Sequence, residues 1–264
     1  MGTAHEFGMH CLNTNMKQMV VSKVPAVTLA FWLIKIAATT LGETGGDALS
    51  MSLGLGYLLS TAIFAAIFVV AVVAQVRAAK FHPWLYWLTI IATTMVGTTL
   101  ADFADRSLGI GYAGGSVLLL TLLLLSLAVW YKTLGTVDVV SVSTPQTEAF
   151  YWITIMFSQT LGTALGDWTA DTEGLGYLGA MLIFGGLLAL MAAAYFWTRI
   201  SHTALFWATF ILTRPLGAVV GDFLDKSHEQ GGLELSRFSA SAALFAFIVI
   251  CLLIFRQRPA EAAH

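Results

Sequence analysis

Four aspartates occupy the same place in a motif that recurs four times along the chain. The motif reads W-x9-G-x3-small-D-x6-G-x-G-Y, and its last copy has Glu229 in place of a Gly and Gly232 in place of the Tyr. Like charges brought together by a repeat repel one another unless a cation lies among them. Oxygen ligands suit hard cations such as Mn²⁺, Mg²⁺ and Ca²⁺. The motif therefore predicts an ion site, and the alternative is that each aspartate caps the turn that follows it. The aspartates are Asp47, Asp102, Asp167 and Asp222.

A polar stripe leads up to each aspartate at four-residue spacing. Residues i, i+4 and i+8 lie close to one face of a helix, and polar residues of a membrane helix normally face protein or water. The stripe predicts a central polar pathway, and it adds candidate ion ligands to the aspartates. These are Glu43, Thr98, Gln159 and Thr163, with Glu43 joining the four aspartates as a candidate metal ligand.

Two cationic residues lie well within apolar segments, Lys35 and Arg214. An unpaired charge there costs at least about 2.5–3.5 kcal/mol. Three interpretations are open: a buried ion pair with Glu43 or an aspartate, a counter-charge that holds or gates the empty site, or an anion site. Pro215 follows Arg214 and predicts a kink, because proline removes a backbone hydrogen bond.

The composition places these residues in a membrane protein. Hydrophobic residues make up 58% of the 264 residues and charged residues 11%, with a mean hydropathy of +0.80, whereas soluble domains carry about 25% charged residues. Apolar segments of about 20 residues can each cross the bilayer core as a helix. We expect an all-α integral membrane protein with eight transmembrane helices. The segments are 25–43, 55–76, 84–101, 112–131, 149–166, 175–197, 204–221 and 236–255.

The spacing of the motif indicates a duplicated pair of helix hairpins. The aspartates are separated by 55, 65 and 55 residues, and each copy contains two segments. All four hairpins then share one orientation, as parallel repeats about a pseudo-fourfold or pseudo-twofold axis along the membrane normal. The expected organisation is a leader (1–24), a first half (25–131), a linker (132–148), a second half (149–255) and a tail (256–264).

The distribution of basic residues predicts the orientation. Eight lie in the termini and the loops between repeats, against three on the side of the aspartates, so the positive-inside rule places both termini in the cytoplasm. The eight are Lys17, Lys23, Arg77, Lys80, Lys132, Arg199, Arg256 and Arg258, and the three are Arg106, Lys226 and Arg237.

Small and aromatic residues predict how the helices pack. Each copy has two small residues four positions apart, such as Gly42 and Gly46 in the first copy and Gly217 and Gly221 in the last. Small residues let helices approach closely in lipid, so this spacing predicts a tight inner ring. The motif tryptophans would pack this ring or close a constriction. We expect Trp84, Trp130 and Trp197 to anchor at the interface. His82 and His202, 120 residues apart, could hold a haem, but interfacial histidines fit them better.

The repeated Trp, G-x4-D and G-x-G-Y elements resemble those of a bacterial membrane-protein family defined by four tandem two-helix repeats of unknown function. The resemblance covers residues 25–255 and implies the fold and the topology, but no activity. We expect the protein to lie in the bacterial inner membrane. Glu43-Thr44-Gly45-Gly46-Asp47 is also similar to the Glu-x-Gly-Asp element of manganese/calcium-type cation exchangers, with one residue more.

The function that these residues favour is transport or export of a metal cation, with Mn²⁺ foremost. The alternatives are transport of an anion or organic solute by Lys35 and Arg214, or a structural membrane subunit. No nucleophile–base arrangement or nucleotide motif indicates an enzyme or a cofactor. The expected partners are the bilayer and a small inorganic ion, and the apolar outer faces would also allow a homodimer. No basic cluster indicates nucleic acid.

Overall fold

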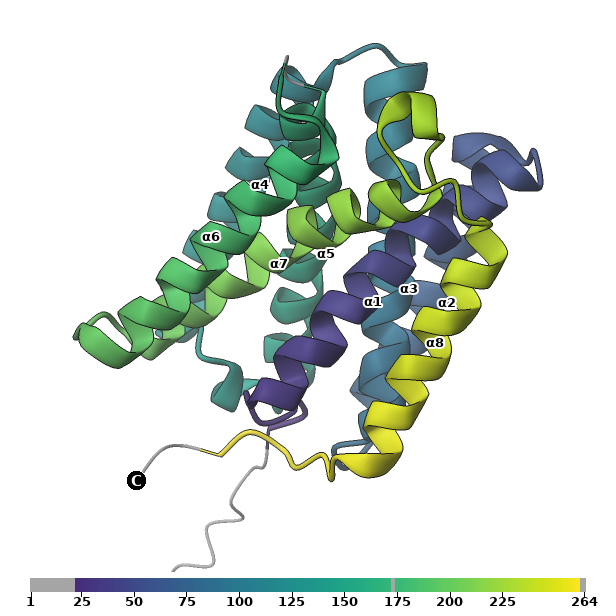
Figure 1. Ribbon diagram of the computed structural model, residues 1–264. Helices are drawn as coiled ribbons and strands as arrows, with labels where there is room; N and C mark the ends of the chain where they lie inside the picture. The colour runs from purple at the N-terminus through teal and green to yellow at the C-terminus, as the bar shows by residue number, and fades with distance from the viewer. Residues whose placement is uncertain (1–21, 172–173, 262–264) are drawn as a thin grey trace, which may run out of the picture.

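The computed structural model describes residues 22–171 and 174–261 and consists of long helices (Figure 1). Most of the predicted leader, residues 1–24, lies outside this part. Across the described residues there are no strands beyond a single bridge between Pro25 and Pro259. The eight long helices are α1 (Leu29–Asp47), α2 (Gly56–Arg77), α3 (Pro83–Asp102), α4 (Tyr112–Leu134), α5 (Pro145–Ala170), α6 (Gly176–Trp197), α7 (His202–Asp225) and α8 (Arg237–Ile254).

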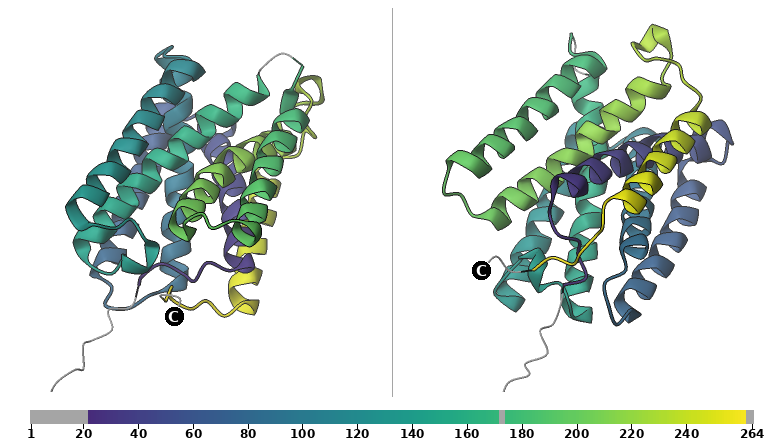
Figure 2. Two further views of the ribbon diagram at one scale, coloured as in Figure 1. Left: turned by 90° about the vertical axis from the view of Figure 1, so that its left-hand side faces the viewer. Right: turned by 60° about the horizontal axis from the view of Figure 1, so that its bottom comes forward.

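The odd-numbered helices form an inner ring. Helix α1 packs against α3 and α7, and α5 packs against the same two helices, so the ring closes. Each outer helix packs mainly on the inner helix of the next repeat: α2 on α3, α4 on α5, α6 on α7 and α8 on α1. Figure 2 shows this interleaving from two further sides. The last repeat thereby closes on the first.

Six of the eight helices are long and apolar enough to cross a membrane: α2, α3, α4, α6, α7 and α8. In the outer helices among them, between 11% and 22% of the most apolar stretch is buried within the protein, against 67% in α3 and 61% in α7. Helices α1 and α5 are not among the six. Helix α1 carries Lys35, Glu43 and Asp47 on a single face, and all three side chains are buried. A helix with these charged side chains is less apolar, and its place inside the bundle keeps the charges away from lipid.

The predicted close packing of the small residues is confirmed. A Cβ atom added to Gly97 on α3 would lie 2.8 Å from the carbonyl carbon of Gln159 on α5. The equivalent glycines meet the next inner helix in the same way: Gly42 meets Thr94, Gly162 meets Arg214, and Gly217 meets Thr39. The small residues and the polar stripes therefore face each other around the ring, and the stripes are held inside it.

Aromatic side chains fill the end of the ring opposite the aspartates. Tyr86 and Tyr151 are fully buried, and their hydroxyl groups share a hydrogen bond of 2.6 Å. The motif tryptophan Trp207 donates from Nε1 to the carbonyl oxygen of Val137 at 2.9 Å. Three of the four motif tryptophans are buried, at Trp87, Trp152 and Trp207. These contacts agree with the packing interpretation.

The prediction for one interfacial tryptophan is wrong. Trp130 is 0% exposed, because Trp207, Tyr151 and Phe150 cover its ring, with a centroid distance of 5.8 Å to Trp207. Trp84 and Trp197 are exposed, as an interface anchor requires.

The two described ends of the chain meet at the aromatic end of the bundle. Figure 1 shows them below the helices, while the turns that follow the four aspartates lie at the top. Lys23 forms a buried ion pair of 2.6 Å with Glu148 at the start of α5, and its Nζ also donates to the carbonyl oxygens of Gln75 and Val76. The segment before α1 is thus tied to both halves of the chain.

Candidate cation site

The four motif aspartates lie on the inner helices themselves. Asp47 and Asp102 are the last residues of α1 and α3, while Asp167 and Asp222 lie inside α5 and α7. All four are at most 5% exposed. The predicted segments ended at 43, 101, 166 and 221, so each helix runs further than expected.

The capping interpretation gains no support from the first two copies. Short π-helical segments follow α1 and α3, at Ala48–Ser52 and Phe103–Ser107. In the described chain neither Asp47 nor Asp102 makes a side-chain capping bond to them. The tight turns come later, where glycines such as Gly54 and Gly56 adopt positive φ values.

Two cationic residues bridge the aspartates in pairs. Arg106 lies 3.1 Å from Asp102 on its own repeat and 3.1 Å from Asp167 on α5. Lys226 lies 3.0 Å from Asp222 on its own repeat and 2.6 Å from Asp47 on α1. Each cation therefore joins two neighbouring inner helices through their aspartates.

A third cation extends the second group. Arg237, the first residue of α8, lies 2.7 Å from Asp225 and 3.9 Å from Asp47. Lys226 also lies 4.0 Å from Asp225. Burial alone would lower the pKa of Lys226, but Asp222, Asp47 and Asp225 outweigh burial and raise the pKa above its ordinary value. The three carboxylates therefore favour the cationic form of Lys226.

The described ion pairs leave an excess of negative charge. Arg106 faces two aspartates, and Lys226 with Arg237 faces three. With every group ionised, each of these two groups carries a formal charge of −1. Together they leave −2 at one end of the ring, enclosed by helices.

Arg214 sits one layer deeper and contacts all three other inner helices. Its Nη2 donates to Glu43 on α1 at 3.0 Å and to Thr98 on α3 at 2.6 Å, and it also donates to the hydroxyl of Thr163 on α5. The predicted buried ion pair is thus formed between Arg214 and Glu43. Helix α7 continues unbroken past Pro215.

Lys35 lies a further turn down and has a different environment. Its side chain is fully buried, and among the described residues its Nζ has no hydrogen-bond partner. Nζ lies over the ring of Phe210, 4.1 Å from the centroid, in a cation–π contact. Gln159 is also buried, and neither atom of its amide is hydrogen-bonded within the described chain. Gln159 therefore makes no hydrogen bond to the aspartates.

Among the residues that the structure describes, two carboxylate triads are compact enough to hold a metal ion. Glu43, Asp167 and Asp222 each place an oxygen within 4.8 Å of the others, and so do Asp47, Asp222 and Asp225. All five residues are buried. Four of the five predicted metal ligands thus enter a triad, while Asp102 belongs to neither and pairs with Arg106. Such oxygen sets suit Mg²⁺, Ca²⁺ or Mn²⁺.

Sequence reasoning missed the partners of the aspartates: Arg106, Lys226, Arg237 and Asp225. A signal for two of them is present, because the second and fourth copies read Asp-x3-Arg and Asp-x3-Lys with the cations 120 residues apart. The first and third copies have Met51 and Asp171 at that position. The cations thus follow the duplication of the halves, while the aspartates follow the fourfold repeat.

His82 and His202 are exposed at the starts of α3 and α7, and His202 lies against Tyr195 with ring centroids 5.0 Å apart. This setting fits interfacial histidines.

The fold and the site together define a membrane-type helical repeat protein built around a buried charged centre. The chain belongs to the family named Repeat of Unknown Function (DUF347), whose sequence profile matches residues 30–81, 85–136, 150–201 and 205–258. The suspected four-repeat family is thereby confirmed. Neither the curated proteins nor the solved structures contain a significant match to the chain.

Proposed function

We propose that this chain transports a divalent metal cation, with Mn²⁺ favoured, across the bacterial inner membrane. The observation that carries the proposal is the group of five buried carboxylates that face only three cations. With every group ionised, its formal charge is −2. A divalent cation would neutralise this charge. A purely structural ion-pair network has no need of two carboxylates in excess, since buried charges without partners are costly.

The packing supports a membrane placement with eight crossings. The outer helices present large apolar side chains such as Leu182, 78% exposed, and Leu253, 71% exposed, a surface suited to lipid or to a second copy of the chain. Helices α1 and α5 cross inside this sheath, around a pseudo-fourfold axis along the membrane normal. The basic residues put the termini in the cytoplasm and the aspartates on the outer side.

The triad of Glu43, Asp167 and Asp222 is the proposed transport site. It draws one oxygen from each of three inner helices. Each of its carboxylates also pairs with a cation: Asp167 with Arg106, Asp222 with Lys226, and Glu43 with Arg214. An entering cation would compete with Lys226 and Arg106 for the same carboxylates. Their release would loosen the bridges between neighbouring helices, so that occupancy of the site and the closure of its outer end are coupled.

The aromatic layer forms the second barrier. Tyr86, Tyr151 and Trp207 close the inner end of the ring, so an ion at the triad is separated from the cytoplasm. Passage requires the layer to part, and this is the behaviour of an alternating-access carrier.

Flux into proteoliposomes tests the proposal. Purified wild type should move Mn²⁺ in preference to Zn²⁺, whereas Asp167→Asn should lose most of this flux. Asp171→Asn is the matched control, because Asp171 is an exposed aspartate at the end of the same helix. Absence of divalent-cation flux in wild type, or equal flux in Asp167→Asn and wild type, would sink the proposal.

A second candidate function is anion transport, and one observation favours it. Nζ of Lys35 and the Nε and Nη1 atoms of Arg214 are buried and make no hydrogen bond to described residues. Within the described part of the chain, Glu43 is the one carboxylate that forms an ion pair with either of these residues. With all three groups ionised, they carry a formal charge of +1. Chloride flux that is lost in Lys35→Met and retained in Asp167→Asn would favour this function over cation transport.

A further inference from the structure

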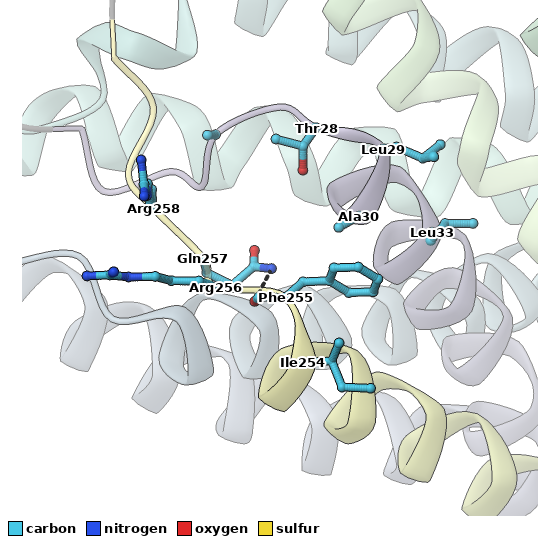
Figure 3. Close-up of a pocket in the computed structure, with 10 residues that line it drawn as sticks. Thr28, Leu29, Ala30, Leu33, Ile254, Phe255, Arg256, Gln257 and Arg258 are labelled. Atoms are coloured by element: carbon cyan, nitrogen blue, oxygen red, sulfur yellow. Dashed lines mark hydrogen bonds between the residues drawn. The ribbon is translucent and has the colours of Figure 1, made fainter.

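A pocket of about 450 Å³ opens at the end of the bundle where the two chain ends meet. It lies between the start of α1 and the segment that follows α8, shown in Figure 3. Its polar lining includes Thr28, Gln257, Arg256 and Arg258, and no acidic residue lines it.

The two ends of this pocket differ in chemistry. Leu29, Leu33, Ile254 and Phe255 lie together at one end of the view in Figure 3, and Arg256 and Arg258 lie at the other. The apolar side chains are open to the surroundings, with Leu29 76% and Ile254 69% exposed. Both arginines are exposed as well, and neither makes an ion pair with a described residue. The pocket is therefore amphipathic, with unneutralised positive charge at one end.

The backbone fixes the arginines relative to α1. The amide of Ala26 donates to the carbonyl oxygen of Arg258 at 2.8 Å, and the amide of Ala260 donates to the carbonyl oxygen of Val24 at 2.8 Å. The segment after α8 is thus pinned to the segment before α1. These bonds hold the backbone that carries the two arginines beside the apolar ends of two helices.

We propose that this pocket binds an anionic phospholipid of the cytoplasmic leaflet. The acyl chains would lie on Leu29, Leu33 and Ile254, and the phosphate would lie between Arg256 and Arg258. Basic residues at the cytoplasmic ends of membrane helices attract anionic lipids, and each contributes a modest share of the binding. The inference rests on the membrane placement proposed above, and it is independent of the ion transported.

Lipid binding to the delipidated protein in detergent micelles tests the assignment. Native mass spectrometry would compare phosphatidylglycerol with phosphatidylcholine of the same acyl chains. Wild type should prefer phosphatidylglycerol. The double variant Arg256→Gln/Arg258→Gln should lose roughly twenty-five-fold in affinity for it, at about fivefold for each arginine.

Arg199→Gln is the matched control, since Arg199 is an exposed arginine of a loop that does not line the pocket. It should bind phosphatidylglycerol as wild type does. Equal binding of the two lipids by wild type would overturn the proposal without any variant. So would a double variant that binds as tightly as wild type, or a control that loses as much affinity. None of these readouts requires transport, so the lipid site and the cation pathway fail or stand separately.

Discussion

Replacing Gly97 by alanine tests whether the inner helices pack as closely as the ring requires. The added Cβ would lie 2.8 Å from the carbonyl carbon of Gln159 and 3.0 Å from the amide nitrogen of Thr160. These are backbone atoms, which no rotamer change can move. Carbon atoms pack best at about 3.5–4.0 Å, so α3 and α5 would have to part by roughly 0.7 Å.

The expected loss of stability combines two opposing effects. Overpacking in a well-packed core costs about 1–3 kcal/mol, and alanine is favoured over glycine within a helix by about 0.5–1 kcal/mol. Gly97→Ala should therefore destabilise the protein by about 0.5–2 kcal/mol. Gly186 on α6 is the matched control, because a Cβ added there meets nothing within 4 Å. Gly186→Ala should be neutral or stabilising by up to about 1 kcal/mol.

Unfolding of both variants in the same detergent, followed by circular dichroism, measures the difference. Gly97→Ala should melt below wild type, and Gly186→Ala should melt at or above it. If Gly97→Ala is stabilised as much as Gly186→Ala, α3 and α5 are not in the close contact described. The polar residues would then not be packed together inside the ring.

Two further predictions concern buried pairs at the aromatic end of the bundle, and the free energy of unfolding tests each of them. Tyr86→Phe removes one partner of a buried 2.6 Å hydrogen bond and should destabilise by about 1–3 kcal/mol, because the hydroxyl of Tyr151 loses its partner. The double change to phenylalanine should destabilise by less than the sum of the single changes, and strict additivity would show that the two hydroxyls do not interact. Lys23→Met should cost about 3–5 kcal/mol, since it leaves the buried carboxylate of Glu148 without its cation. Adding Glu148→Leu should recover part of that loss, whereas a further loss would contradict the pairing.

The repeat and the polar stripes were predictable because both follow from local rules. Spacing by four residues puts Thr39, Glu43 and Asp47 on one helix face whatever the surrounding fold. Equivalent residues of different repeats then lie at the same depth in the ring, as Glu43, Thr98 and Thr163 do around Arg214. The small residues predicted in addition that the inner helices pack closely against their neighbours. The contacts of Gly97 and Gly217 confirm this prediction.

The partners of the aspartates were not predictable in this way. Arg106 reaches Asp167 because α5 lies beside α3, and Arg237 reaches Asp225 and Asp47 because α8 packs on the first repeat. The outer helices are apolar on all sides, so their sequences do not show which inner helix they cover.

The helix ends and Trp130 were missed for a related reason. Hydropathy alone treats each aspartate as the start of a loop, although ion pairs with Arg106 and Lys226 allow the helix to continue with its carboxylate buried. Trp130 has the position of an interface anchor, but contacts distant in sequence, above all with Trp207, bury it.

Equilibrium binding of Mn²⁺ to the purified protein tests the central claim most directly, because it isolates the carboxylate site from transport and folding. Asp222 belongs to both triads, so Asp222→Asn should weaken binding by more than roughly tenfold, since even residues that only orient metal ligands often have that effect. Lys226→Gln, which removes a competing cation, should bind Mn²⁺ at least as tightly as wild type. If wild type shows no saturable binding, or Asp222→Asn binds as wild type does, the buried carboxylates are not a cation site.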